Sequence, residues 1–220
     1  MARFSTLIFD FDGTVAYTAP DVWDAVEAGT LVFGKKIDPD YRADPRNLSL
    51  HPRKIFEDCL GPLTDEEYWK AQNALSQLYG QDTDYPKTVL YPGMDEFLDR
   101  AKLEGISCGI VTRKSARSLG RILDAHNWRH WFYDWYGSES LGGHKTKAEL
   151  IDALLKKMPD ASRPVYIGDS AGDISAAKEL GIPSVALTYG DGDTEELLAQ
   201  NADKVCYTVP DLYMWVFNKE

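Results

Sequence analysis

The chain has 220 residues, 44% of them apolar, and carries 24 Lys and Arg against 35 Asp and Glu, a formal net charge of −11. This composition is typical of a folded globular protein and excludes intrinsic disorder as the main state. The negative charge repels phosphate backbones and anionic lipid headgroups, so we expect neither nucleic acid nor a membrane surface as a partner. The three cysteines cannot all pair within one molecule, and no apolar run approaches the length of a membrane helix, so we expect a cytoplasmic protein.

Short apolar runs recur along the chain and predict strands. None of them shows the polar alternation of a half-exposed strand, and they cover residues 6–9, 106–111, 164–167, 184–188 and 204–207. Strands that are buried on both faces of a parallel sheet have this pattern. The first run leads into Asp10, the second into Thr112 and the third into Gly168 and Asp169.

Helical patterns alternate with these runs from about residue 88 to the end. Residues 94–103 place apolar side chains on one stripe, and Thr146 with Glu149 has the spacing of a capping box before another stripe. A further helix is predicted to begin near Asp193, and the aromatic stretch 128–136 is predicted to pack beside the sheet. Alternating strands and helices indicate an α/β fold with a doubly wound, Rossmann-like parallel sheet.

The stretch from residue 16 to residue 86 breaks this alternation, because it contains helical patterns but no strand pattern. Its predicted helices cover about 21–33, 52–60 and 64–78. Since the first strand needs a parallel neighbour, the helical block after it is best explained as an inserted second domain. We therefore predict an α/β core formed by residues 1–15 and 87–220 and a small helical cap domain formed by residues 16–86.

Two pairs of carboxylates follow predicted strands. Asp10 and Asp12 come after the first strand, and Asp169 and Asp173 come after the third. Because the carboxyl ends of parallel strands lie at one edge of a sheet, these four side chains are expected to converge there. Crowded carboxylates recruit a cation, and a few oxygen ligands with room for water favour Mg²⁺ over Ca²⁺. Asp173 alone fits a helix cap equally well, and Thr14 is expected to steady Asp10 or to cap the next segment of the chain.

Four motifs stand in a fixed order along the predicted core. They are Asp10-Phe-Asp-Gly-Thr14, Thr112, a lysine near position 147, and Gly168-Asp-Ser-Ala-Gly-Asp173. In these motifs the chain resembles the haloacid dehalogenase-like phosphohydrolase superfamily. Within it the chain is similar to the phosphoglycolate phosphatase group, at Thr18-Ala-Pro-Asp21, Val111-Thr-Arg-Lys114 and Gly181-Ile-Pro-Ser-Val-Ala-Leu-Thr-Tyr-Gly190. The resemblance implies a phosphatase that acts on a small phosphorylated metabolite.

The resemblance also implies a role for each carboxylate. Asp10 would attack the substrate phosphorus in line and form an aspartyl-phosphate. Asp12 would protonate the leaving oxygen and then deprotonate the attacking water. Mg²⁺ would be held by Asp10, the backbone carbonyl of Asp12 and Asp169, with Asp173 as a further ligand or as a residue that orients the others. Dehalogenases of this superfamily lack a carboxylate at the Asp12 position, so Asp12 implies a leaving group that needs a proton.

Hydroxyl and cationic side chains are expected to bind the phosphate. Thr112 directly follows a predicted strand, where its hydroxyl and the next amides can hold a phosphoryl oxygen. Lys145 and Lys147 both fit the third motif. We favour Lys147, because a cation in the first turn of a helix opposes the macrodipole, and a residue placed against local preference often serves a function. Arg113 is expected to contact the substrate, since arginine suits bidentate contacts with anions.

The predicted cap carries further cations in a stretch that is similar to the loop facing the active site in the phosphoglycolate phosphatase group. His51, Arg53 and Lys54 lie in it, and Arg53 is the candidate for binding substrate. A solvated helix start explains the three residues equally well. The sequence does not identify the physiological substrate, because caps vary more freely than the catalytic residues.

Two other functions use the same residue types. A beta-phosphoglucomutase-like phosphosugar mutase would employ Asp10 and Asp12 but return the phosphoryl group to a sugar. A receiver-type signalling protein also combines acidic residues, Mg²⁺, Thr, Lys and a phosphorylated Asp on a parallel sheet, but receivers are far shorter and lack a helical insert. We therefore predict a Mg²⁺-dependent phosphoric monoester hydrolase that acts as a monomer or a homodimer.

Overall fold

The computed structural model describes residues 3–218, and the chain divides into two compact units. The sheet unit comprises the chain up to Tyr17 and from Val89 onward, and the helical unit comprises Thr18–Thr88. The predicted domain boundaries, after residues 15 and 86, lie close to these points. In the part of the chain that the structure describes, no helix combines the length and the apolar character needed to cross a membrane.

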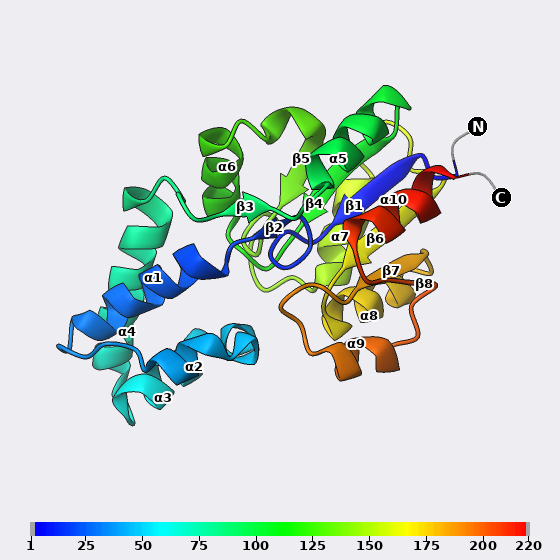
Figure 1. The fold of residues 1–220 in the computed structure, drawn as a ribbon. Helices are drawn as coiled ribbons and strands as arrows, with labels where there is room; N and C mark the ends of the chain where they lie inside the picture. Colours follow the sequence, from blue (N-terminus) through cyan, green and yellow to red (C-terminus); the bar gives the residue numbers. More distant parts are fainter. Residues whose placement is uncertain (1–2, 219–220) are drawn as a thin grey trace. The chain divides into compact units, whose positions relative to one another are not determined.

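Within the described residues, six parallel strands form the main sheet, which confirms the predicted α/β fold class. Their order across the sheet is β5 (Phe132–Tyr136), β4 (Ser107–Val111), β1 (Thr6–Phe9), β6 (Pro164–Gly168), β7 (Ser184–Leu187) and β8 (Lys204–Cys206). From β1 the chain builds one side of the sheet through β4 and β5 and then the other side through β6 to β8 (Figure 1). The strand order therefore reverses beside β1, where open α/β sheets bind ligands.

Two short elements differ from the sequence-based prediction. The aromatic stretch 128–136 is predicted only to pack beside the sheet, but its second half forms the edge strand β5, paired with β4. Tyr133 of this strand is 58% exposed, so β5 lacks the continuous burial that marks the central strands. A second pair, β2 (Ala16–Tyr17) with β3 (Val89–Leu90), is antiparallel, and β2 lies where no strand is predicted. Partly exposed short strands leave little periodic signal in a sequence.

Helices cover both faces of the main sheet (Figure 1), and they are α5 (Met94–Leu103), α6 (Ala116–Ala125), α7 (Lys147–Leu155), α8 (Ala171–Glu179), α9 (Thr194–Ala199) and α10 (Val209–Phe217). On one face, Ile8 of β1 and Tyr166 of β6 share an apolar cluster with α7 and α8. On the other face, Phe97 of α5 packs edge-on against Phe9 of β1 and also contacts Tyr213 of α10. Because both faces are covered, polar side chains can gather only at the strand ends.

The helical unit contains α1 (Ala19–Leu31), α2 (Pro39–Ala43), α3 (Pro52–Leu60) and α4 (Asp65–Gln77), with a 3-10 turn at Pro45–Ser49 and a π turn at Leu78–Asp82. The three helices predicted in this stretch are therefore present, and α2 is an additional short helix. Helix α4 begins at Asp65 because Thr64 and Glu67 form a capping box. Its apolar face packs with α1 and α3 in a core that includes Trp23 and Phe56.

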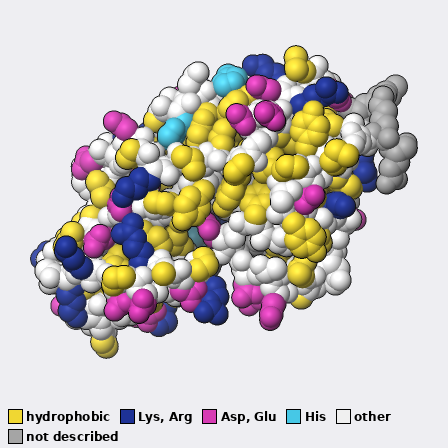
Figure 2. All heavy atoms as spheres, viewed as in Figure 1, with side chains coloured by type: hydrophobic (Ala, Val, Ile, Leu, Met, Phe, Trp, Pro, Cys, Tyr) yellow, Lys and Arg dark blue, Asp and Glu magenta, His cyan; other side chains and the backbone are white. Residues whose placement is uncertain are grey.

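Ion pairs cover the surface of the helical unit. Figure 2 shows Lys and Arg side chains beside Asp and Glu side chains over this part of the molecule. Arg42 bonds Asp24 at 2.8 Å, and Lys54 pairs with Asp58 one helical turn away. Exposed pairs of this kind each contribute about 0–1 kcal/mol to stability, so the unit depends mainly on its apolar core.

A buried carboxylate joins the two ends of the helical unit. Asp21, near the start of α1, is only 4% exposed. Its Oδ2 accepts hydrogen bonds from the Thr88 hydroxyl at 2.8 Å and from the Lys87 backbone N–H at 3.1 Å. These bonds fix the first helix of the unit to the segment by which the chain leaves it.

Replacing Asp21 by Ala is predicted to destabilise the helical unit by about 1–3 kcal/mol, because buried donors on Thr88 and Lys87 lose their acceptor. Amide exchange measured by mass spectrometry should accelerate in peptides from α1 and α4. Thr88→Val removes one of the two bonds and should give a smaller effect in the same direction. Unchanged exchange in Asp21→Ala would show that this contact does not hold the unit together.

Candidate functional site

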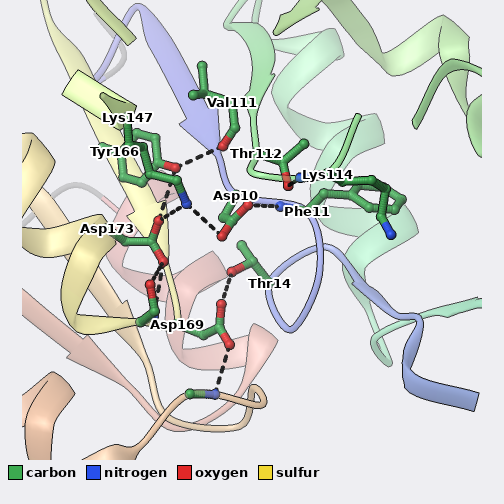
Figure 3. Close-up of polar contacts among 12 residues, drawn as sticks. Asp10, Phe11, Thr14, Val111, Thr112, Lys114, Lys147, Tyr166, Asp169 and Asp173 are labelled. Atoms are coloured by element: carbon green, nitrogen blue, oxygen red, sulfur yellow. Dashed lines mark hydrogen bonds and ion pairs between the residues drawn. The ribbon is translucent and has the colours of Figure 1, made fainter. Parts of the chain in front are cut away.

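Five of the predicted site residues lie at the carboxyl edge of the main sheet (Figure 3), namely Asp10, Thr112, Lys147, Asp169 and Asp173. Asp10 directly follows β1, Thr112 follows β4 and Asp169 follows β6. In the parallel register, Phe9 of β1 is level with Ile110 of β4 and with Ile167 of β6. The three strands therefore end at nearly the same height, and the side chains after them face one another.

Three carboxylates lie close together at this edge. Oxygen atoms of Asp10, Asp169 and Asp173 all lie within 4.8 Å of one another. Asp169 is 5% exposed and Asp173 is fully buried. Such a group of oxygen donors is the kind of site that hard divalent cations occupy in proteins.

Lys147 lies between two of these carboxylates. Helix α7 begins at Lys147 because Thr146 and Glu149 form a capping box, and this start aims the side chain at the sheet edge. The Lys147 ammonium donates to Asp10 Oδ2 at 2.8 Å and also to Asp173 Oδ1 (Figure 3). Burial opposes its charge, but the two carboxylates raise the pKa of Lys147 above its usual range. Lys145, the other lysine considered, pairs with Glu149 instead.

Asp173 both caps a helix and belongs to the acidic cluster. Its Oδ2 accepts from the Ser170 hydroxyl at 2.6 Å and from the Ser170 N–H at 2.9 Å, a capping box that starts α8. Its Oδ1 contacts Lys147 and lies 3.2 Å from the Tyr166 hydroxyl, which is also 3.0 Å from the Val111 carbonyl oxygen. Although burial opposes ionisation, Lys147 and Ser170 hold the pKa of Asp173 below its ordinary value.

Asp169 is fixed by neutral donors. The Thr14 hydroxyl donates to its Oδ1 at 2.9 Å, and the backbone N–H groups of Asp191 and Gly192 donate to its Oδ2 at 2.9 and 3.2 Å. Thr14 therefore steadies Asp169 rather than Asp10. Gly13 passes so close that a Cβ there would lie 2.2 Å from Asp169 Oδ2, and its φ of +73° is one that glycine adopts without strain.

The site carries more negative charge than its own cation balances. Burial raises the pKa of Asp10 from 3.8 to about 6, even though Lys147 is in contact with it. Burial, together with the nearby Asp10 and Asp173, raises the pKa of Asp169 well above its ordinary value. Buried carboxylates with raised pKa values are stabilised by an added cation, so the donor set fits a divalent metal ion.

The carboxylate of Asp12 has a separate partner. Its Oδ1 lies 3.1 Å from the ammonium of Lys114, whose side chain is 8% exposed. Lys114 also donates its backbone N–H to the Thr112 hydroxyl oxygen at 3.2 Å, while the Thr112 N–H bonds the Tyr136 carbonyl. Lys114 ends the motif Val111-Thr-Arg-Lys114, but its position in the sequence does not indicate a contact with Asp12. Arg113, between Thr112 and Lys114, is exposed.

The cations proposed for substrate binding in the cap lie in the helical unit and have partners there. The guanidinium of Arg53 contacts Asp65, Glu57 and the Leu63 carbonyl oxygen. The His51 ring accepts from the Arg53 N–H at the start of α3. These contacts show how Arg53 is held within its own unit, whereas the five site residues Asp10, Thr112, Lys147, Asp169 and Asp173 meet at the sheet edge.

Comparisons with known proteins agree with this arrangement. A family model described as haloacid dehalogenase-like hydrolase matches residues 7–187. A phosphoglycolate phosphatase of Psychrobacter arcticus is 32% identical over 195 residues, which cover 84% of this chain and 83% of that protein. A second phosphoglycolate phosphatase, from Vibrio parahaemolyticus, is 27% identical over 214 residues, which cover 94% of this chain and 93% of that protein. In fold, a crystal structure described as a predicted phosphoglycolate phosphatase from Haemophilus somnus matches with a TM-score of 0.81 at 24% identity, covering 96% of this chain and 97% of that one.

Replacing Asp169 by Asn is predicted to stabilise the protein in EDTA at neutral pH. The folded-state pKa of Asp169 is raised above the ordinary 3.8, so the folded protein holds this proton more tightly than the unfolded chain does. The stability that the proton contributes is present below about pH 4 and is lost as the pH rises through the folded-state pKa. An amide avoids this cost, and it can still accept from Asp191 and donate to Thr14.

Urea unfolding in EDTA checks this prediction. At pH 7.5 the variant should unfold at a higher urea concentration than the wild type, because it lacks the buried charge that Asp169 carries above its raised pKa. The difference should shrink toward pH 4. A variant that is less stable than the wild type at pH 7.5 would contradict the claim that the buried negative charge of Asp169 destabilises the metal-free protein.

Proposed function

We propose that this chain, which belongs to the haloacid dehalogenase-like hydrolases and is a phosphatase, hydrolyses a small phosphomonoester through a phosphorylated Asp10. The observation that carries the proposal is the buried group of Asp10, Asp169 and Asp173, with the Lys147 ammonium between two of its members. Since the curated relatives are named phosphoglycolate phosphatases, phosphoglycolate is the first substrate we propose.

Asp10 is the group we assign as nucleophile. Its Oδ1 accepts from the Phe11 N–H at 2.8 Å and its Oδ2 from Lys147 at 2.8 Å, so the carboxylate is held in one orientation. An oxygen of Asp10 attacks phosphorus as the bond to the leaving oxygen breaks, and Asp12 gives that oxygen its proton. Water then attacks the phosphorus of the aspartyl-phosphate, Asp12 takes a proton from it, and the Asp10 carboxylate is restored.

Mg²⁺ is the cation we propose for the donor set. Asp10, Asp169 and the backbone carbonyl of Asp12 would hold it, and the raised pKa values of Asp10 and Asp169 support this choice. When bound, the ion would offset the charge of these carboxylates and of the phosphoryl group. Asp173 belongs to the same group of oxygen donors, and its Oδ1 contacts Lys147, so we propose it as a further ligand or as the residue that orients Lys147.

Thr112 and Lys147 are the residues we assign to the phosphoryl oxygens. The Thr112 hydroxyl oxygen accepts from the Lys114 N–H, which fixes its position at the end of β4. The Lys147 ammonium has three hydrogens, so it can bond a phosphoryl oxygen in addition to its two carboxylates. Arg113, exposed beside Thr112, is our candidate for contact with the rest of the substrate. We propose the helical unit as the cap that selects the substrate, with Arg53 as a second candidate within it.

Asp10→Asn is predicted to lower the rate of phosphate release by at least about 1,000-fold, because the amide oxygen is a poor nucleophile for phosphorus. The substitution keeps the size of the side chain, so the far-UV circular dichroism should match the wild type. Phosphate release from phosphoglycolate measures the effect. Undiminished turnover in the variant would refute the assignment of the nucleophile.

A matched control and a set of substrates make this experiment specific. Asp95→Asn changes an exposed acid in the first turn of α5 and should retain full activity. Release of phosphate from sugar phosphates separates a phosphatase from a mutase, which would isomerise them without release. A stable aspartyl-phosphate that forms once and does not turn over would instead indicate a receiver-type protein.

Magnesium is predicted to raise the thermal midpoint of the wild type by several degrees, because an ion that binds only the folded state stabilises it. EDTA should abolish activity and added Mg²⁺ should restore it. Asp169→Asn removes one proposed ligand, so Mg²⁺ should leave its midpoint nearly unchanged. A midpoint of the wild type that does not respond to Mg²⁺ at millimolar concentration would overturn the metal assignment.

A further inference from the structure

The cation beside Asp12 has no part in the function proposed so far. Two lysines contact the two acids of the first motif, since Lys147 bonds Asp10 and Lys114 bonds Asp12. In Figure 3 they lie on different sides of Asp10. The Lys114 side chain is 8% exposed and the Asp12 carboxylate is 33% exposed, so the lysine is the more deeply held member of the pair.

The backbone around Lys114 is fixed by several bonds. Its N–H donates to the Thr112 hydroxyl oxygen at 3.2 Å, and its carbonyl accepts from the Ser138 N–H at 3.1 Å. Gly137 makes the second contact possible, because a Cβ there would lie 2.5 Å from the Lys114 carbonyl oxygen. The ammonium therefore extends from a turn that cannot shift without breaking contacts on both sides.

The next turn of the chain is held just as firmly. The Ser115 side chain accepts from the Ser118 N–H and starts α6, and the Glu139 carboxylate accepts from the N–H groups of Ala116 and Arg117. An acid placed at this helix start stabilises it. The segment that carries Lys114 is thus anchored before and after the lysine.

We propose that Lys114 is a positioning residue that holds the Asp12 carboxylate in place for proton exchange with the leaving oxygen. This inference rests on the proposed function, in which Asp12 gives a proton to the leaving oxygen and later takes one from water. The ammonium engages Asp12 Oδ1, and Oδ2 is the oxygen we assign to both proton transfers. Asp12 lies on the loop after β1, so without this contact its carboxylate has more orientations, and misplacement of about 1 Å costs catalysis heavily.

The inference predicts a loss that depends on the leaving group. Glycerol 2-phosphate releases an alcohol and needs the proton from Asp12, whereas 4-nitrophenyl phosphate releases a stable phenolate and hardly needs it. Both leaving groups are uncharged before the reaction, so neither offers Lys114 an anion to bind. The ratio kcat/KM reports the step that expels the leaving group, whereas the later hydrolysis of the aspartyl-phosphate is the same for both substrates. In Lys114→Met, kcat/KM for glycerol 2-phosphate should fall roughly 100-fold, within the range that general acid catalysis contributes. The kcat/KM for 4-nitrophenyl phosphate should fall less than about 5-fold.

Two further variants separate positioning from a general structural role. Lys114→Arg keeps the cation and should recover much of the lost kcat/KM for glycerol 2-phosphate. In an Asp12→Ala background, Lys114→Met should cause no additional loss, because the residue through which it acts is already absent. Lys156→Met, which removes an exposed lysine paired with Asp152, is the matched control and should behave as the wild type.

The outcomes distinguish the two proposals. Equal losses of kcat/KM with both substrates, or additive losses in the Asp12→Ala background, would overturn the role of Lys114 while leaving the phosphatase assignment intact. A rise in KM alone, of the same size for both substrates, would also overturn it and would assign Lys114 to binding substrate. A wild type that releases phosphate from neither substrate, nor from phosphoglycolate, would overturn the proposed function and this inference with it.

Discussion

The ammonium of Lys147 lies between the carboxylates of Asp10 and Asp173, and the arrangement of the site depends on this contact. Removing a buried cation from two buried carboxylates leaves charges that burial makes very costly. The contact also ties together three parts of the fold, the loop after β1, the start of α7 and the start of α8. One lysine therefore determines both the geometry of the acid group and how much negative charge remains for a cation to balance.

The same residues start helices and build the site. The capping box of Thr146 and Glu149 fixes where α7 begins, and that start puts Lys147 at the sheet edge. Asp173 caps α8 through Ser170 while its other oxygen holds Lys147. One set of hydrogen bonds therefore both starts these helices and positions the side chains of the site. A substitution at a capping residue is expected to disturb the site as well as the helix.

Much of this arrangement could be predicted from the sequence, and each of the three exceptions has its own physical cause. The central strands were recognisable because they are apolar throughout, but β5 was not, since an edge strand such as Phe132–Tyr136 mixes exposed and buried side chains. Thr14 contacts Asp169, which is 155 positions away, rather than the nearer Asp10. The buried hydroxyl of Tyr166 was hidden within an apolar run, where its only signal is that a polar atom stands in a buried strand.

The sequence by itself determined the fold class and the acids of the site. Apolar runs and capping boxes act locally, and parallel strands must bring their carboxyl ends to one edge. Only the tertiary structure decided which partner each acid has, that Lys147 rather than Lys145 reaches Asp10, and that Lys114 reaches Asp12. The physical reason is that an ion pair is set by the positions of two atoms in space, and the spacing of residues along a chain does not contain those positions.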